Sequence, residues 1–412
     1  MSAHPRRALA AGAVLAVIAL LSACGGGDTG ADKITAAKPP LTIGISLSLS
    51  GDFSDPGVAA QRGYKLWADV VNGRGGVLGR KVQLSIIDDR SDPDRAARNY
   101  EALIAEREVD LVFGPFSTLL TIPSARVAAR HHYAFPEPAG GGPSVFAEKL
   151  GNLFFVQPAP SVNCGDAFVD WVLSLPRSQR PRTAAYAALD DPFATPITNR
   201  VRRKLEAAGV RTVFKTIYSS EVADLAPIVR RYAARKPDLV FAGVQSEDAY
   251  SQVRAMVRAD FNPKFLFFSN AANSPAEFPE KIGAENTDGI FSCGDWFSHS
   301  KTAGNPEFIQ SYVARYGGTP QAIDSGSAEA YAVGQLIELV AGRTGKVDNR
   351  TIIDSLHEGT WPVVVGNLSW DAVGAPTGTV GLAQWSGGKL LPVYPPHQAV
   401  AEPQAPKPPW GG

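Results

Sequence analysis

The stretch VDLVFGPFST, residues 109–118, recurs in altered form as PDLVFAGVQS at residues 237–246, 128 positions later (237 − 109). Each copy runs an apolar strand into a short loop of small and polar residues. A helical stretch and a second apolar strand follow in both cases, written YAFPEPAGGG at 133–142 and KFLFFSNAAN at 264–273. A repeated succession of this kind indicates two similar units in tandem. We therefore predict two α/β lobes.

Strand-like and helix-like segments alternate along the rest of the chain. Apolar residues alternate with small or polar ones at 41–49, which predicts a strand, whereas those in 58–71 share one face of a helix. Residues 82–88 predict the next strand, and Asp92-Pro93 predicts the start of the helix after it. This alternation favours an α/β fold with parallel sheets covered by helices.

The two copies predict where a ligand binds. In an open parallel sheet, ligands bind beyond the carboxyl ends of the strands. Loops 114–118 and 139–142 of the first lobe are therefore expected to face loops 243–246 and 269–273 of the second lobe across a cleft.

The last third of the chain predicts a return to the first lobe. Helical stretches at 306–316 and 325–342 follow the second lobe, and a hairpin turning at Gly387-Gly388 closes the pattern. Such a path needs several crossovers between the lobes, which together form a hinge.

Composition excludes several classes of protein. The chain has 412 residues, is 44% hydrophobic and 19% charged, and carries 40 basic and 40 acidic side chains. It is therefore expected to be globular, without the basic field that nucleic-acid binding requires. The histidines and cysteines show no metal-ligand spacing, so no metal or other cofactor is expected.

The N-terminus reads as a processing signal covering residues 1–23. Arg6 and Arg7 precede an apolar run that is too short to span a bilayer. The sequence Leu-Ser-Ala before Cys24 resembles a bacterial lipobox, which predicts a lipid on Cys24; the alternative is an ordinary secretory signal. Residues 24–40 predict a flexible tether, and 396–412 form a proline-rich tail.

Cys164 and Cys293 remain once Cys24 is assigned to lipid. An even pair in an exported protein permits a disulfide, because such compartments are oxidising. Two buried free thiols are the alternative. Both cysteines fall near predicted crossovers, so a bridge between them would tie two hinge segments together.

The mature chain resembles a known family over roughly residues 41–398. The segments that carry the resemblance are VVNGRGGVLGRKVQLSIIDDRSDP (70–93), LVFGPFST (111–118) and LPVYPPHQAVAEPQAPKPPW (391–410). They resemble type I periplasmic solute-binding proteins, with the leucine/isoleucine/valine-binding proteins of ABC importers as the nearest branch.

The resemblance implies an architecture and a role. It implies a Venus-flytrap fold of two Rossmann-like lobes joined by three crossover strands, with the first lobe at 41–157 plus 294–362 and the second at 158–293 plus 363–395. It also implies a monomeric receptor without enzymatic activity, anchored by lipid at the outer face of the cell membrane. The receptor would close on a small molecule and deliver it to a membrane permease.

The resemblance also implies site residues. The hydroxyl that grips a ligand carboxylate corresponds to Ser117, with Thr118 beside it. The backbone loop that completes this anion site corresponds to Ala139-Gly140-Gly141. The aromatic lid corresponds to Phe193, and the polar second-lobe residues are Gln245 and Asn270. Apart from the resemblance, Phe116 and Trp296 are candidates for apolar walls, and simple packing is the alternative for Trp296.

One departure from the family bears on the ligand. Residues 269–273 contain no carboxylate where amino-acid binders usually hold the ligand's ammonium, and Ser161 replaces a second acid. An ammonium buried without an anion costs several kcal/mol. We therefore expect carboxylates, amides and aromatic acids to be candidates comparable to α-amino acids, unless Glu247, Asp248 or Asp166 supplies the charge.

Ser117 is interpreted as an anchor for the ligand. A hydroxyl at a strand-to-helix junction lies beside unpaired backbone N–H groups at the positive end of the helix dipole. A nucleophilic serine needs a G-x-S-x-G elbow and a histidine base, and residues 114–118 lack the second glycine. An extracytoplasmic hydrolase using Ser117 is thus the weaker alternative, and a sensor that presents its bound state to a signalling partner is another.

Overall fold

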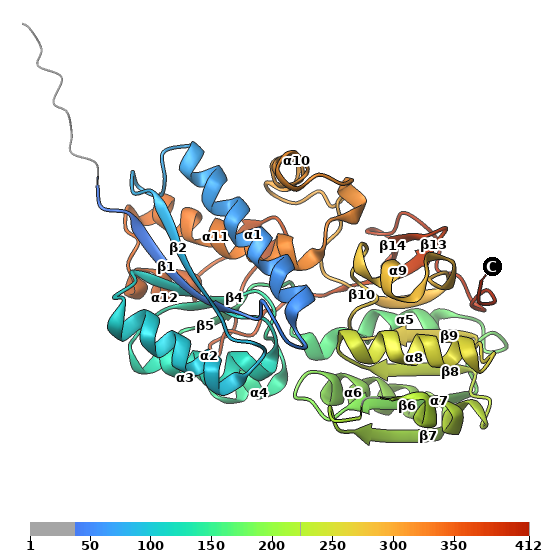
Figure 1. Cartoon of the computed structure of the whole chain (residues 1–412). Coiled ribbons are helices and arrows are strands. Elements are labelled where there is room, and N and C mark those ends of the chain that lie inside the picture. The colour runs from blue at the N-terminus through green and yellow to red at the C-terminus, as the bar shows by residue number, and fades with distance from the viewer. Residues whose placement is uncertain (1–37, 223, 412) are drawn as a thin grey trace, which may run out of the picture. The chain divides into compact units, whose positions relative to one another are not determined.

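The first lobe is built on parallel strands with helices on both faces (Figure 1). The structure, a computed structural model, describes residues 38–222 and 224–411. Strands β1, β2 and β3 pair in the order β2–β1–β3, and β4 pairs with β5, all in parallel. Gly114 N, just past β3, donates to Pro136 O on β4 at 2.9 Å, which places the two groups of strands side by side. The elements of this lobe are β1 (Leu41–Leu47), α1 (Ser54–Gly73), β2 (Val82–Asp88), α2 (Pro93–Glu101), β3 (Leu111–Phe113), α3 (Thr118–Arg130), β4 (Phe135–Glu137), α4 (Pro143–Ala147), β5 (Leu153–Phe155), α10 (Asn305–Tyr316), α11 (Ser325–Thr344), α12 (Asn349–Leu356), β11 (Trp361–Val363) and β12 (Gly366–Leu368).

The second lobe is built on a seven-stranded sheet in the order β14–β13–β10–β9–β8–β6–β7. Strands β10, β9, β8, β6 and β7 run parallel, and β13 and β14 form an antiparallel hairpin at one edge, with positive φ at Gly387 and Gly388 in its turn. The elements are α5 (Asp166–Ser174), β6 (Thr183–Leu189), α6 (Ala194–Ala207), β7 (Arg211–Tyr218), α7 (Ala226–Ala233), β8 (Leu239–Gly243), α8 (Ser246–Arg258), β9 (Phe265–Phe268), α9 (Glu277–Ile282), β10 (Ile290–Gly294), β13 (Gly381–Ser386) and β14 (Lys389–Tyr394). The predicted α/β class with mostly parallel sheets is therefore confirmed.

An aspartate is the second residue of both copies of the repeat, and in both lobes it makes the same hydrogen bonds to a threonine of the neighbouring strand, here called a clamp. Asp110 Oδ2 accepts hydrogen bonds from Thr42 N and Thr42 Oγ1 at 2.8 and 2.9 Å. Asp238 Oδ2 accepts from Thr183 N and Thr183 Oγ1, both at 3.2 Å. In each lobe the carboxylate thus fixes the start of the repeated strand, β3 or β8, against its neighbour, β1 or β6.

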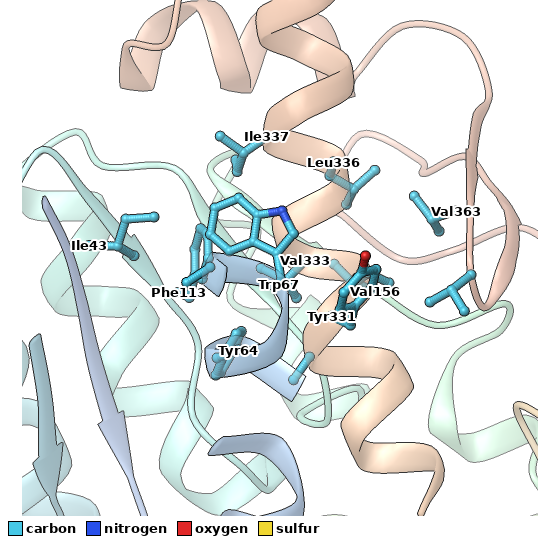
Figure 2. Close-up of a cluster of buried hydrophobic side chains, with 14 of the residues drawn as sticks. Ile43, Tyr64, Trp67, Phe113, Val156, Tyr331, Val333, Leu336, Ile337 and Val363 are labelled. Atoms are coloured by element: carbon cyan, nitrogen blue, oxygen red, sulfur yellow. The ribbon is translucent and has the colours of Figure 1, made fainter. Parts of the chain in front are cut away.

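The largest core lies between the first sheet and the pair α1 and α11 (Figure 2). Tyr64 and Trp67, predicted on the buried face of the 58–71 helix, are fully buried against Phe113 of β3 and Tyr331 of α11. Gly334 on α11 allows this contact, because a Cβ there would lie 2.0 Å from the Trp67 ring. Helices α2 and α3 cover the opposite face of the sheet.

The chain passes between the lobes at three places. Val156 packs in the first-lobe core and Cys164 in the second, so one crossing lies between them. The chain crosses back between Cys293 and Trp296, and the third crossing lies after Trp370 and before β13. The prediction that residue 363 begins a second-lobe segment is therefore wrong. The β11–β12 hairpin, with Val364, Val365 and Trp370, packs in the first-lobe core because its side chains are apolar and cover α11 and β5.

Both predicted end segments make specific contacts. Arg80 donates to Pro39 O and Pro40 O, so the last residues of the predicted tether are bound to the first lobe. In the proline-rich tail, Lys407 N donates to Lys264 O and Trp410 Nε1 to Phe261 O, which fixes the tail along the second lobe. The predicted signal peptide and Cys24 lie outside the described residues, and no helix among the described ones is long and apolar enough to cross a membrane.

Candidate functional site

A cavity lies between the lobes, next to all three crossings. The space it encloses, together with open solvent at its mouth, has a volume of about 870 Å³. The first lobe contributes Pro56, Phe116, Ser117, Thr118, Ala139, Asp324, Ser325, Gly326 and Glu329, and the second lobe contributes Phe193, Gln245, Ser246, Ser269, Asn270, Ala271, Asn273, Ser274 and Glu277. Residues at the crossings complete the wall: Gln157, Ala159, Pro160, Ser161, Cys164, Cys293, Asp295 and Val380.

Ser117 lies at the junction of β3 and α3 and caps the helix. Its Oγ accepts a hydrogen bond from Leu120 N at 3.4 Å, and the residue is 3% exposed. Its backbone has a φ of 76°, a conformation that residues other than glycine rarely adopt. Strain of this kind persists where the surrounding structure requires it, commonly at ligand sites. Thr118 beside it accepts a hydrogen bond from Gly142 N at 3.1 Å.

Gln245 holds the corresponding position in the second lobe. It is the N-cap residue of α8, and its side chain accepts from the helix while Gln245 N donates to Asp248 Oδ2 at 3.4 Å. Asn270 Nδ2 donates to Gln245 Oε1 at 2.8 Å, which fixes the orientation of the amide at the cavity wall. Phe193, the predicted lid, caps α6 nearby and donates its N–H to Asp191 Oδ1 at 2.7 Å.

The predicted anion-binding loop at residues 139–141 binds a side chain of the protein itself, Glu137. Ala139 lines the cavity, but Gly140 and Gly141 do not. Ala139 N and Gly140 N donate to Glu137 Oε2, at 2.9 and 2.5 Å, so an internal carboxylate occupies these donors. Burial raises the pKa of Glu137 to about 8. The glycines are needed for space, because a Cβ on Gly141 would lie 2.1 Å from the Phe155 ring.

Trp296 packs in the first-lobe core and does not line the cavity. It is 6% exposed, its ring meets Phe308 at 5.5 Å in a T-shaped arrangement, and its Nε1 donates to Asn305 Oδ1 at 2.8 Å. The residue before it, Asp295, is the one that lines the cavity.

Four acids line the cavity, and the sequence analysis identified none of them: Asp295, Asp324, Glu329 and Glu277. Burial raises the pKa of Asp295 to about 6 and that of Glu277 to about 7, and it raises the pKa of Glu329 well above its usual value. No lysine, arginine or histidine is among the described residues that line this cavity. Residues 269–273 contain no carboxylate, as the sequence shows, but acids from other segments line the cavity.

The acids named beforehand have other partners. Asp166 pairs with Arg200 at 2.7 Å and Lys204 at 2.7 Å, and Asp248 caps α8; neither these two nor Glu247 lines the cavity. The signal for Glu329 was present in the sequence. It stands between Ala328 and Ala330 in the first half of α11, residues 325–334, where every other residue is small or apolar, and such a stretch of helix is typically buried.

Cys164 and Cys293 form a disulfide, with Cα atoms 5.2 Å apart. Both lie in the second-lobe core, each within a few residues of a crossing, and both sulfur-bearing residues line the cavity. The bond therefore joins the start of the second lobe to the end of its parallel sheet. The described part of the chain contains no cluster of side chains suited to a metal ion.

The sequence family agrees with this geometry. The model of the family described as periplasmic binding protein matches residues 40–389. The chain is a type I periplasmic binding protein of the Leu/Ile/Val-binding branch. Leu/Ile/Val-binding protein homolog 8 of Brucella abortus (strain 2308) is 24% identical over 384 residues, which cover 89% of this chain and 94% of the relative.

Solved structures of periplasmic binding proteins share the fold. The branched-chain amino acid transporter substrate-binding protein LivJ from Streptococcus pneumoniae, in complex with isoleucine, has a TM-score of 0.75 at 18% identity, covering 90% of this chain and 100% of LivJ. A solute-binding protein of an R. palustris ABC transporter, in complex with benzoate, has a TM-score of 0.72 at 18% identity, covering 90% and 98%. Both of these structures are described as binding proteins of transporters. The family to which this chain belongs is one of binding proteins and not of enzymes.

Proposed function

We propose that this periplasmic binding protein is the receptor of an ABC importer and binds a small organic solute with a carboxylate or amide group in the cavity between its lobes. The observation that carries the proposal is that Ser117 and Gln245, the capping residues of equivalent helices, line one cavity from opposite lobes. Helix N-termini attract anionic and carbonyl groups because their first N–H groups are unpaired and the helix dipole is positive there.

Hinge closure is the proposed binding step. The cavity wall is divided between the lobes, and the chain links them only where it crosses, so rotation about these segments opens or closes the cavity. Ser274 Oγ of the second lobe donates to Asp324 Oδ2 of the first lobe at 2.7 Å, a contact suited to the closed form. A ligand that contacts both lobes favours that form.

The proposal includes a place in the cell. The family indicates a location outside the cytoplasm, and we propose that lipid on Cys24 anchors a monomer near its permease. Metabolic labelling with a lipid precursor tests this step, with Cys24→Ser as the variant that loses the label.

A ligand screen tests the binding function. Thermal shift and calorimetry with branched-chain amino acids, amides, urea, and aliphatic and aromatic acids are expected to give at least one ligand that raises the unfolding midpoint. Small-angle scattering with that ligand should show compaction, and Ser117→Ala should weaken binding. A bound solute that is chemically altered, or a ligand that leaves scattering unchanged, contradicts the proposal.

A further inference from the structure

The cavity contains an acid that is buried without a counter-charge. Glu329, on the second turn of α11, is 4% exposed and lines the cavity. The polar groups beside it, the Ser325 hydroxyl and the Gln157 amide, are uncharged. The charged groups close enough to act on it are themselves acidic, Asp295 at the second crossing and Asp324 at the start of α11.

We infer that the cavity is built for an organic cation, and that Glu329, Asp295 and Asp324 hold an ammonium or guanidinium group of the ligand other than the α-ammonium of an amino acid. This inference rests on the proposed function, because it names the class of solute that the same cavity takes. It adds a positive group to whatever carboxylate or amide binds near Ser117 and Thr118.

The basic residues nearest to these acids lie outside the cavity wall. Arg62 of α1 acts on Asp324 and Glu277, and Lys281 of α9 acts on Glu277, but neither lines the cavity. Arg62 instead lies over the Tyr316 ring at 5.8 Å. Asp55 of α1 adds another negative charge on the same side, acting on Asp324 and Glu277.

Three other buried or half-buried acids have partners within the protein. Asp166 has Arg200 and Lys204, and Glu137 has two backbone amides. Asp324 is partly satisfied, since it accepts from Ser274 Oγ and from Gly326 N at 2.7 and 2.8 Å. Glu329 and Asp295 make no salt bridge with any described residue, although they face solvent-accessible space that a ligand can occupy.

The energetics favour a cation over a neutral molecule of the same shape. Removing a carboxylate from water without a partner is costly, so the group retains a proton until a cation compensates it. Burial accordingly raises the pKa of Glu329, and the charges of Asp295 and Asp324 raise it further. The Coulomb attraction of an ammonium or guanidinium group placed among these acids compensates for the hydration that the carboxylates lose on burial, whereas an anion there is repelled.

The matched probes are L-arginine and L-citrulline, which have the same length and shape but differ in charge. Agmatine, L-leucine and benzoate extend the set: the first lacks the carboxylate, and the others lack a side-chain cation. In calorimetry at pH 7.5, the cationic probes are expected to bind about tenfold to a hundredfold more tightly than citrulline. Lowering the pH to 5 should weaken arginine binding and leave citrulline binding unchanged, because only the cation depends on ionised acids.

Variants assign the effect to the acids. Glu329→Gln keeps the shape of the side chain and removes its charge, so it should weaken arginine binding about tenfold or more while citrulline changes by less than about twofold. Asp295→Asn provides a second, independent variant. Glu280→Gln is the control, because Glu280 is an exposed acid of α9 that does not line the cavity, and it should leave both affinities unchanged.

The outcomes separate the two proposals. Tight binding of leucine, benzoate or citrulline together with weak binding of arginine and agmatine overturns the cation inference and leaves the receptor function intact. Equal loss of arginine and citrulline affinity in Glu329→Gln also overturns it. If no solute of any charge binds, the proposed function itself fails and this inference fails with it.

Discussion

Ser117 and Gln245 hold equivalent positions in the two lobes, 128 residues apart (245 − 117). Each is the N-cap residue of the helix that follows the repeated strand, and each side chain lines the same cavity. The offset equals that between the two copies of the repeat, so the cavity is framed by two copies of one local structure. The short hydroxyl on one side and the longer amide on the other give the ligand different partners.

Replacing Ser117 with alanine should weaken binding of the ligand found in the screen about tenfold, because one hydrogen bond to a polar or charged group is lost. The unfolding free energy should also fall by about 1 kcal/mol, because Leu120 N loses its capping acceptor. Calorimetry and urea unfolding measure the two effects.

Asp348→Ala is the matched control for Ser117→Ala. Asp348 caps α12 by accepting from Thr351 N at 2.9 Å, and it does not line the cavity. It should lower stability by a similar amount and leave affinity unchanged. Equal affinities of wild type and Ser117→Ala would remove Ser117 from the site.

The paired clamps predict that Asp110→Asn and Asp238→Asn each lower stability by about 1–3 kcal/mol at pH 7, because each replaces a carboxylate that accepts several hydrogen bonds. These hydrogen bonds and the adjacent cations, Arg80 and Lys264, hold the pKa of both carboxyls below its usual value.

An acid with a lowered pKa stabilises the fold above its unfolded pKa and loses that contribution as the pH falls through its folded pKa. The difference between wild type and either variant should therefore shrink as the pH falls below about 4. Urea unfolding from pH 3 to 7 measures it, with the exposed Glu358→Gln as the control. A difference that stays constant over this range contradicts the role of the charge.

Glu137 predicts the opposite dependence on pH. Because burial raises its pKa to about 8, the folded state binds more protons than the unfolded state between about pH 4.5 and 8. Stability should therefore fall as the pH rises through this window, by up to about 1.4 kcal/mol per pH unit for this one group.

Glu137→Gln should remove that slope, because glutamine still accepts from Ala139 N and Gly140 N but does not titrate. Guanidinium unfolding at several pH values between 5 and 8 compares the two slopes. Glu148 is a half-buried acid of the same lobe, and its hydrogen bonds with Arg126 lower its pKa, so Glu148→Gln should keep the wild-type slope in this range. Identical slopes for wild type and Glu137→Gln would show that Glu137 is not a buried titrating group.

Removing residues 404–412 should destabilise the second lobe by about 2–5 kcal/mol. Gln384 is 1% exposed and exchanges two hydrogen bonds of 2.7 Å with the backbone of Gln404. Truncation leaves its buried Oε1 without this donor and its Nε2 with only the 3.3 Å hydrogen bond to Gly289 O. Ligand affinity should persist, because the tail does not line the cavity. Differential scanning calorimetry provides the measurement, and an unchanged midpoint would show that the tail contributes nothing to stability.

The sequence predicted the parts of the site that follow a repeated local pattern. Ser117, Thr118, Gln245 and Asn270 were found because strand ends in a parallel sheet converge on one edge, and the two copies marked those ends. Glu329 was missed because it comes from a helix more than 200 residues further along the chain than Ser117 (329 − 117). The return of this helix to the first lobe was predicted, but no local pattern indicates which of its side chains faces the cavity.

The lobe boundary after residue 362 was misplaced for a related reason. The sequence of the β11–β12 hairpin shows that it needs an apolar surface to cover, but both lobes offer one. The hairpin belongs to the first lobe because it packs against α11, and that contact depends on the path of the whole chain. For Trp296 both wall lining and simple packing were expected, because the sequence predicts a crossing segment there but does not indicate which of its side chains faces the cavity.

The disulfide places two sulfur atoms in the wall of the cavity. Protein made in a reducing cytosol would carry thiols there, within reach of alkylating reagents that fit the opening. A solute bound against those walls would shield them, so the rate of alkylation of Cys164 and Cys293 offers a direct chemical readout of occupancy that needs no label on the solute.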